Sequence, residues 1–180
     1  MSIIIEQDAK EFRAASEFSI HAELDRVTLI HAAVEKASNI GSLSRPFELS
    51  FDYEPGAAAV KSGCANLQVR FHFRAADPAH NDAVTVKCTL EASYSLAKNY
   101  SPETDVVHAF HSANAVFNSW PFFREYVQST VLRMNMPAPP VPLLRLVARP
   151  KDESATLAPA EKEVRSSSPR RKRQAKSTRG

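Results

Sequence analysis

Hydrophobic and polar side chains alternate in three stretches of the chain, residues 47–53, 65–75 and 84–96. This strict period of two predicts strands of an antiparallel sheet, each with one buried and one wetter face. An earlier stretch, residues 18–36, begins with the same alternation and slips phase by one at Asp25-Arg26. The slip indicates either a β-bulge or a break between two short strands.

The connections between these strands, residues 55–62 and 76–82, have the length of hairpin loops, and the second contains Asp-Pro and Asn-Asp turn dipeptides. We therefore expect a four-stranded antiparallel meander. Cross-strand pairing favours contacts between acidic side chains of the second strand and basic ones of the third. The acids are Glu48, Asp52 and Glu54, and the bases are Arg70 and Arg74.

After Tyr100 the apolar period changes to that of a helix. Ser101-Pro102-Glu103 is typical of a helix start, and the apolar residues that follow at helical spacing are Val106, Phe110, Ala113 and Phe117. A second, longer helix is expected to begin at Asn118-Ser119, with an apolar stripe of Trp120, Phe123, Val127, Val131 and Met134. The predicted fold class is α+β: a four-stranded antiparallel sheet followed by one short and one longer helix.

The C-terminal part of the chain is rich first in proline and then in basic residues. The segment 136–142 predicts a stiff extended connector, and residues 143–147 predict a short strand. Apolar residues then become sparse, so we expect disorder over residues 150–180. We predict one folded domain, residues 1–148, and a disordered basic tail, residues 149–180.

Charge is divided unevenly between these two parts. The net charge of the whole chain is +3, and residues 165–180 contain seven Lys and Arg with no acid. The other 164 residues contain 16 basic and 20 acidic groups, so the predicted domain is mildly acidic. The basic cluster at 169–179 indicates attraction to nucleic acid or another anionic surface, with a merely solubilising tail as the alternative.

Length and composition narrow the class of protein. The chain has 180 residues and two cysteines, and the single disulfide that these could form is not enough to hold together a domain of this size. The N-terminus lacks the apolar stretch of a signal peptide, and the longest charge-free, apolar-rich stretch, residues 109–123, is shorter than the ~20 residues of a membrane span. We expect a soluble, cytoplasmic protein with no membrane insertion.

Candidate catalytic chemistry is sparse. Asp105, His108 and His111 follow one another at intervals of three, a spacing that can ligate a metal, although a solvated helix face explains the same residues. Four scattered glycines do not form a phosphate-binding loop, and no nucleophile elbow is present. We predict a protein that is not an enzyme and that has no cofactor and no metal site. A metal-dependent enzyme built on the Asp105 set remains an alternative.

The predicted elements leave apolar surface uncovered. Four strands of about ten residues form a slab of roughly 19 by 33 Å. A helix of fifteen residues is only about 22 Å long and 10 Å wide. Two such helices are too small to cover one face of the slab and, at the same time, to have their own second faces buried. Monomers rarely expose large apolar patches, and we therefore expect a homo-oligomer, namely a tetramer, or a protein that binds partners in apolar grooves.

The sequence of residues 118–137 resembles the helix of the SecB family of export chaperones. In that family an aromatic or apolar residue precedes a proline, an Arg-Glu pair follows, an arginine comes about two turns later, and a proline follows the helix. Five residues match this pattern position for position: Pro121, Arg124, Glu125, Arg133 and Pro137. The wider resemblance covers about residues 18–147.

The resemblance implies a cytoplasmic, ATP-independent holdase that assembles as a dimer of dimers and wraps unfolded or nascent polypeptides along hydrophobic grooves. Export members of the family deliver clients to SecA, and divergent members protect an antitoxin. The family's second C-terminal helix has no match here, because the proline-rich segment stands in its place, and the basic tail also differs from the family. Among acids that face SecA, Glu35 is the one counterpart found.

For client binding we expect apolar side chains from the sheet, from the second face of the longer helix and from the segment after the prolines. These residues are Phe47, Leu49, Phe51, Tyr94, Phe122, Tyr126, Leu143 and Leu144. Each is also interpretable as ordinary core. The alternative function is a nucleic-acid-associated adaptor that acts through the basic tail.

Overall fold

The computed structural model describes residues 2–37, 47–76 and 82–149. Before the large sheet come β1 (Ser2–Gln7) and α1 (Ala9–His21). The strands of the large sheet are β2 (Ala22–Lys36), β3 (Glu48–Lys61), β4 (Cys64–Ala76) and β5 (Asp82–Leu96). A helical run follows, made of α2 (Thr104–Phe110), a π-helical turn (His111–Ala115) and α3 (Val116–Arg133), and then β6 (Leu143–Ala148).

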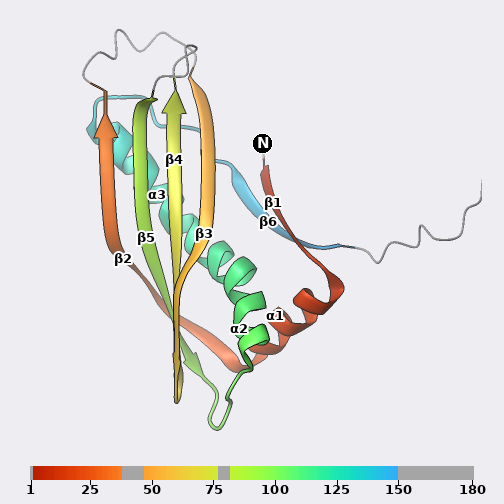
Figure 1. The fold of residues 1–180 in the computed structure, drawn as a ribbon. Coiled ribbons are helices and arrows are strands. Elements are labelled where there is room, and N and C mark those ends of the chain that lie inside the picture. The colour runs from red at the N-terminus through yellow and green to blue at the C-terminus, as the bar shows by residue number, and fades with distance from the viewer. Residues whose placement is uncertain (1, 38–46, 77–81, 150–180) are drawn as a thin grey trace, which may run out of the picture.

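The large sheet is antiparallel with the strand order β2-β5-β4-β3 (Figure 1). The α+β fold with a four-stranded antiparallel sheet is thus confirmed, but the expected meander holds only for β3, β4 and β5. The first strand pairs with β5 instead of β3. Eleven residues separate Lys36 from Glu48, a connection long enough to cross the ends of two strands, a distance of about 14 Å at the usual strand spacing. That connection and the turn at 77–81 lie outside the described residues.

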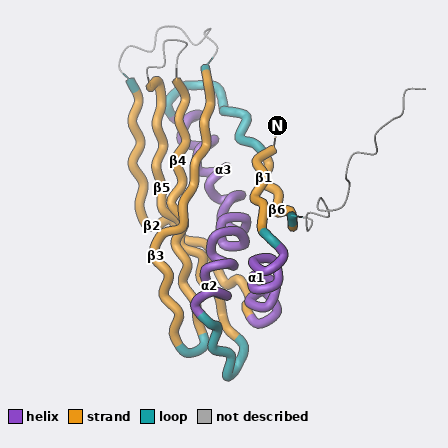
Figure 2. Tube along the Cα trace, turned by 45° about the vertical axis from the view of Figure 1, so that its right-hand side comes forward, coloured by secondary structure: helices purple, strands orange, loops and turns teal. Residues whose placement is uncertain are grey.

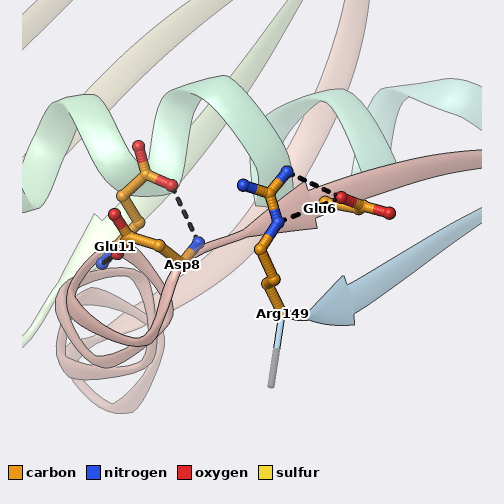
Figure 3. Close-up of polar contacts among 4 residues, drawn as sticks. All are labelled: Glu6, Asp8, Glu11 and Arg149. Atoms are coloured by element: carbon orange, nitrogen blue, oxygen red, sulfur yellow. Dashed lines mark hydrogen bonds and ion pairs between the residues drawn. The ribbon is translucent and has the colours of Figure 1, made fainter. Parts of the chain in front are cut away.

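The segment around Phe18 is helical, so the expected strand at 18–36 begins too early. Asp8 starts α1 with a capping box: its carboxylate accepts hydrogen bonds from the backbone N–H groups of Lys10 and Glu11, and the Glu11 carboxylate accepts one from the Asp8 N–H (Figure 3). The helix then buries Phe18 against the core. The predicted slip at Asp25 is confirmed as a register shift between Leu24 and Arg26, where β2 pairs with β5.

The strand β3 is longer than its alternation of apolar and polar residues predicted. Residues 55–61, expected in a hairpin loop, continue β3, and the turn to β4 is the dipeptide Ser62-Gly63. A register shift between Pro55 and Ala58 interrupts the pairing with β4. Gly56 lies within this bulge, where an added Cβ would stand 3.0 Å from the carbonyl oxygen of Gln68. A side chain at this position would crowd the backbone of Gln68, and the register shift hid the second half of β3 from a period-two pattern.

The two expected helices form one uninterrupted helical run, and no break occurs at Asn118-Ser119. The π-helical turn adds a residue to the run, so the apolar stripe moves by one position after it. Val116 is therefore fully buried, whereas Phe117, which ordinary helical spacing placed in the core, is 43% exposed. Pro121 lies inside α3 rather than near its start.

The ends of the described chain meet in a second, two-stranded sheet. β1 and β6 pair in parallel from Ser2 opposite Leu143 to Gln7 opposite Ala148, so the short strand predicted at 143–147 is confirmed. Arg149 extends the contact through an ion pair with Glu6 at 2.8 Å (Figure 3). In Figure 2 the helical run lies between the large sheet on one side and β1, β6 and α1 on the other.

Candidate binding groove

An apolar cavity of about 360 Å³ lies where the start of β3, the end of α3 and the proline-rich segment meet. Every residue that lines it is apolar: Phe47, Leu49, Phe73, Ala75, Val84, Val131, Met136, Pro137, Ala138, Pro139 and Pro140. Its volume falls within the range of about 300–1,000 Å³ that is usual for ligand pockets. We call this cavity and the adjoining edge of β3 the groove.

One wall of the groove is an edge strand. Phe47 directly precedes β3 and Leu49 is its second residue, and both are partly buried against the hydrophobic core. β3 is the last strand of the large sheet, and in the described part of the chain no strand pairs with its outer edge. Backbone groups along this edge are therefore available to a further strand.

The other wall is residues 136–142, which we call the proline strap. Three side chains of α3 donate hydrogen bonds to its backbone carbonyls. Trp120 Nε1 donates to Pro142 at 2.9 Å, Arg124 Nε to Val141 at 3.3 Å, and Gln128 Nε2 to Pro139 at 3.3 Å. The donors are four residues apart, so they form one row along the helix.

Trp120 anchors this arrangement in the core. Its side chain is 2% exposed, and its ring centroid lies 5.2 Å from that of Phe123, 5.9 Å from Phe71 and 6.4 Å from Phe51. Phe71 and Phe123 stack with centroids 4.7 Å apart. The aromatic cluster fixes α3 against β3 and β4, and the indole N–H fixes the end of the strap.

The sequence-predicted client residues do not all lie in one place. Phe47 and Leu49 line the groove, and Phe51 follows them on β3, partly buried against Phe73 and Trp120. Tyr94 is buried in the core. Its ring packs edge-to-face on Phe18 and Phe110, its hydroxyl accepts a hydrogen bond from Asn118, and burial raises its pKa to about 12. A client therefore cannot reach Tyr94 in this conformation.

The four predicted residues from outside the large sheet are also divided. Phe122 is 46% exposed on α3 and Tyr126, one turn later, is partly buried. In β6, Leu143 is exposed and Leu144 is buried. None of the four lines the cavity.

The residues that carry the family pattern have distinct surroundings. Arg124 donates to the strap, and Pro137 is part of the strap and lines the cavity. Pro121, Glu125 and Arg133 are exposed on α3. Sequence reasoning did not identify Gln128, a polar residue outside the apolar stripe of α3. The signal that identifies it is its spacing of four and eight residues from Arg124 and Trp120.

A second cavity, of about 510 Å³, lies across all four strands of the large sheet and is lined in part by charged side chains. Its polar lining comes from His31, Asp52, Glu54, Arg70, His72, Lys87 and Thr89. The predicted pairing of Glu54 with Arg70 is confirmed at 2.9 Å, and Arg74 forms an ion pair with Asp82. Glu35, the residue matched to a SecA contact, is exposed on β2 opposite Thr85.

The residues considered for metal binding do not converge. His111 is buried, and its Nε2 donates to the carbonyl oxygen of Gln68 at 2.7 Å, while Asp105 and His108 are exposed. Burial lowers the pKa of His111. Within the described ranges, no three His, Cys, Asp or Glu side chains gather as the ligands of a metal ion would. Burial also raises the pKa of the Cys88 thiol to about 12, far from the value of a nucleophile at neutral pH.

None of the helices in the described part of the chain combines the length and the apolar content that a bilayer span requires.

Comparison with known proteins gives a result for the structure only. No protein-family model and no curated protein sequence matches the chain. Among solved structures, the chain is similar to the SecB-like chaperone Rv1957 of Mycobacterium tuberculosis, solved in complex with a ChAD peptide from the antitoxin HigA1 (Rv1956). The TM-score is 0.68 at 16% sequence identity, over 75% of this chain and 99% of that one.

A protein of unknown function from Streptococcus agalactiae aligns over 67% of this chain and 95% of its own, at 9% identity. Its TM-score of 0.36 is too low to indicate a common fold. The alignment with Rv1957, by contrast, spans nearly the whole of that protein at a TM-score of 0.68. The chain therefore has the fold of the SecB-like chaperones.

Proposed function

We propose that this protein is an ATP-independent chaperone that binds unfolded or nascent polypeptides, in extended form, in the groove. The observation that carries the proposal is the cavity of about 360 Å³ with a wholly apolar lining, set beside the unpaired edge of β3. An apolar lining accepts many different side chains, and a strand edge pairs with any extended backbone. Both features suit a binding protein with varied clients and no chemistry.

The fold supports the same proposal. Rv1957 was solved with a peptide from an antitoxin. An antitoxin segment is accordingly one client class that we propose here, and export clients delivered to SecA are the other. The genes beside this one distinguish the two roles, because an adjacent toxin–antitoxin pair would favour the first.

We further propose a cytoplasmic homo-oligomer, a dimer of dimers. The apolar side chains that β2 leaves exposed support it, among them Leu24, Leu29 and Ile30. Light scattering tests the assembly: a stable monomer of about 20 kDa at micromolar concentration would contradict it. In this proposal residues 1–148 form the chaperone domain, and the basic tail from residue 149 is a separate segment.

Suppression of aggregation tests the chaperone function. Wild-type protein is expected to suppress aggregation of a denatured model protein at near-stoichiometric ratio without ATP. Leu49→Ser, in the groove, should lose most of this activity, and Phe122→Ser/Tyr126→Ser measures what the outer face of α3 adds. Ile20→Ser is the matched control, because Ile20 is 79% exposed on α1 and does not line the groove.

The variants must remain folded by circular dichroism for the comparison to count. No suppression by the wild type would refute the proposal. An equal loss of aggregation suppression in Ile20→Ser and Leu49→Ser would show that nonspecific contacts with exposed apolar side chains, and not the groove, bind the client.

A further inference from the structure

The proline strap is attached to α3 through the backbone carbonyls of the strap and not through the side chains of the strap. Three donors in one row of the helix, Trp120, Arg124 and Gln128, reach three backbone carbonyls of the strap. Four of the seven strap residues are proline and have no N–H to donate. The strap therefore cannot pair with the β3 edge as a regular strand, although it lies across the cavity from Phe47 and Leu49.

Hydrogen bonds to α3 hold the strap at both ends and in its middle. At one end the Met136 N–H donates to the carbonyl of Val131, and at the other the buried Trp120 indole holds Pro142. Between these two ends, Arg124 and Gln128 hold the strap through hydrogen bonds of 3.3 Å, the same length as the bond of Met136. The residues that line the cavity, Met136 to Pro140, belong to this middle part and the anchor before it.

The burial of the strap shows which way it is held. Pro139 and Val141 are buried, whereas Pro137, Ala138 and Pro140 are exposed. The carbonyl of Pro139 accepts the hydrogen bond from Gln128, and Pro139 itself lines the cavity. Gln128 therefore directly holds a residue of the cavity wall. A strap released from α3 would have apolar side chains beside an apolar cavity, and burial of both would draw it inward.

We propose that Gln128 and Arg124 are positioning residues for client binding: they hold the proline strap against α3 and away from β3, and so keep the groove open to an extended chain. This inference rests on the proposed function. A client binds only the open arrangement, so its apparent affinity falls in proportion to the fraction of molecules whose strap is held.

The test compares donor-free and donor-retaining variants of one residue. Gln128→Leu has similar bulk and no donor, Gln128→Lys retains a donor, and Arg124→Met/Gln128→Leu removes both. Glu125→Gln is the control, because Glu125 is exposed on the same helix. The probe is fluorescently labelled, reduced and carboxymethylated α-lactalbumin, which is permanently unfolded, and the readout is its dissociation constant.

We expect about fivefold weaker binding for Gln128→Leu, as the loss of one hydrogen bond implies, and a larger loss for the double variant. Gln128→Lys and Glu125→Gln should stay within about twofold of wild type. Amide hydrogen exchange adds a readout that general destabilisation does not reproduce: exchange at Val141, whose N–H donates to the Pro139 carbonyl, should accelerate in Gln128→Leu while exchange in α3 is unchanged.

Two results would overturn the inference. The first is unchanged or tighter binding by Gln128→Leu while the strap amides exchange faster, since the position of the strap would then not matter. The second is equal weakening in Gln128→Leu and Gln128→Lys, since the donor would then not be the cause. If wild type does not bind the probe at all, the proposed function fails, and hydrogen exchange alone still decides whether the donors hold the strap.

Discussion

The two central strands of the large sheet and its two outer strands bury very different amounts of apolar surface. On β4, alternate residues from Ala65 to Ala75 are buried, and on β5 the same holds from Val84 to Leu96. In contrast, no residue of β2 or β3 is fully buried, although both strands carry leucine, valine or aromatic side chains at alternate positions.

The difference follows from the width of the covering layer. A helix is about 10 Å wide and neighbouring strands are about 4.8 Å apart, so one helical run covers about two strands. Most contacts of α3 with the large sheet accordingly fall on β4 and β5, although Phe51 of β3 also packs against Trp120. The apolar residues of β2 and β3 form the surplus that a client or a second copy would cover. Exposure at the outer strands is thus a product of the architecture and not of their composition.

The strongest way to break this comparison is to remove the aromatic anchor beneath the central strands. Trp120→Ala should cost about 3–5 kcal/mol, because it deletes a buried ring and its hydrogen bond to the strap. Urea denaturation measures the loss, with Phe122→Ala, half-exposed on the same helix, as the control. If both variants unfolded at the same urea concentration, Trp120 would not be the anchor that its burial indicates.

A matched pair of leucines tests the comparison directly. Leu29 on β2 lies opposite Leu90 on β5 in the sheet register, yet Leu29 is 44% exposed and Leu90 is 3% exposed. Leu90→Ala should cost about 2–5 kcal/mol of unfolding free energy, and Leu29→Ala less than about 1 kcal/mol. The urea midpoints of the two variants measure both values. A large loss in Leu29→Ala that depends on protein concentration would show that a second copy covers the outer strand.

The central strands and the apolar stripe of α3 could be predicted from the sequence because period and burial coincide there. Trp120, Phe123, Val127 and Val131 are all buried as their spacing predicted. The prediction failed where one inserted residue changes the period. The π-helical turn at His111–Ala115 moved burial from Phe117 to Val116, and the bulge at Gly56 concealed the second half of β3.

The N-terminal helix was missed for a different reason. Phe18, Ile20 and Ala22 alternate as a strand would, and the capping box of Asp8 and Glu11, a strong helix signal, lies ten residues earlier. For the groove, the sequence identified Phe47, Leu49 and the stiffness of residues 136–142, but not that the strap lies across the cavity from β3. Long-range placement of this kind depends on side-chain donors such as Gln128, whose partners cannot be read from a pattern of polarity.

The buried His111, where the helical run meets the central strand β4, should make the free energy of unfolding depend on pH. Burial lowers the pKa of His111 from its ordinary value of 6.5, so below about pH 6.5 the unfolded chain takes up a proton that the folded chain resists. This contribution to stability is therefore fully present above pH 6.5 and is lost as the pH falls. His111→Gln retains a donor for the Gln68 carbonyl but does not titrate. Urea midpoints at pH 8 and pH 5.5 should differ more for wild type than for this variant, whereas the exposed His108→Gln should follow wild type.

The smallest effect is expected from a polar contact of an outer strand. Glu54 on β3 and Arg70 on β4 form an ion pair at 2.9 Å, and both side chains are mostly exposed. Water and salt screen such pairs, so Glu54→Gln should lower the unfolding free energy by less than about 1 kcal/mol, and the difference should shrink further in high salt. Urea denaturation at low and high salt measures both, with Asp52→Gln on the same strand as the control. A loss as large as that of Leu90→Ala would mean that ion pairs hold the outer strand in place, and apolar burial would no longer account for the contrast between central and outer strands.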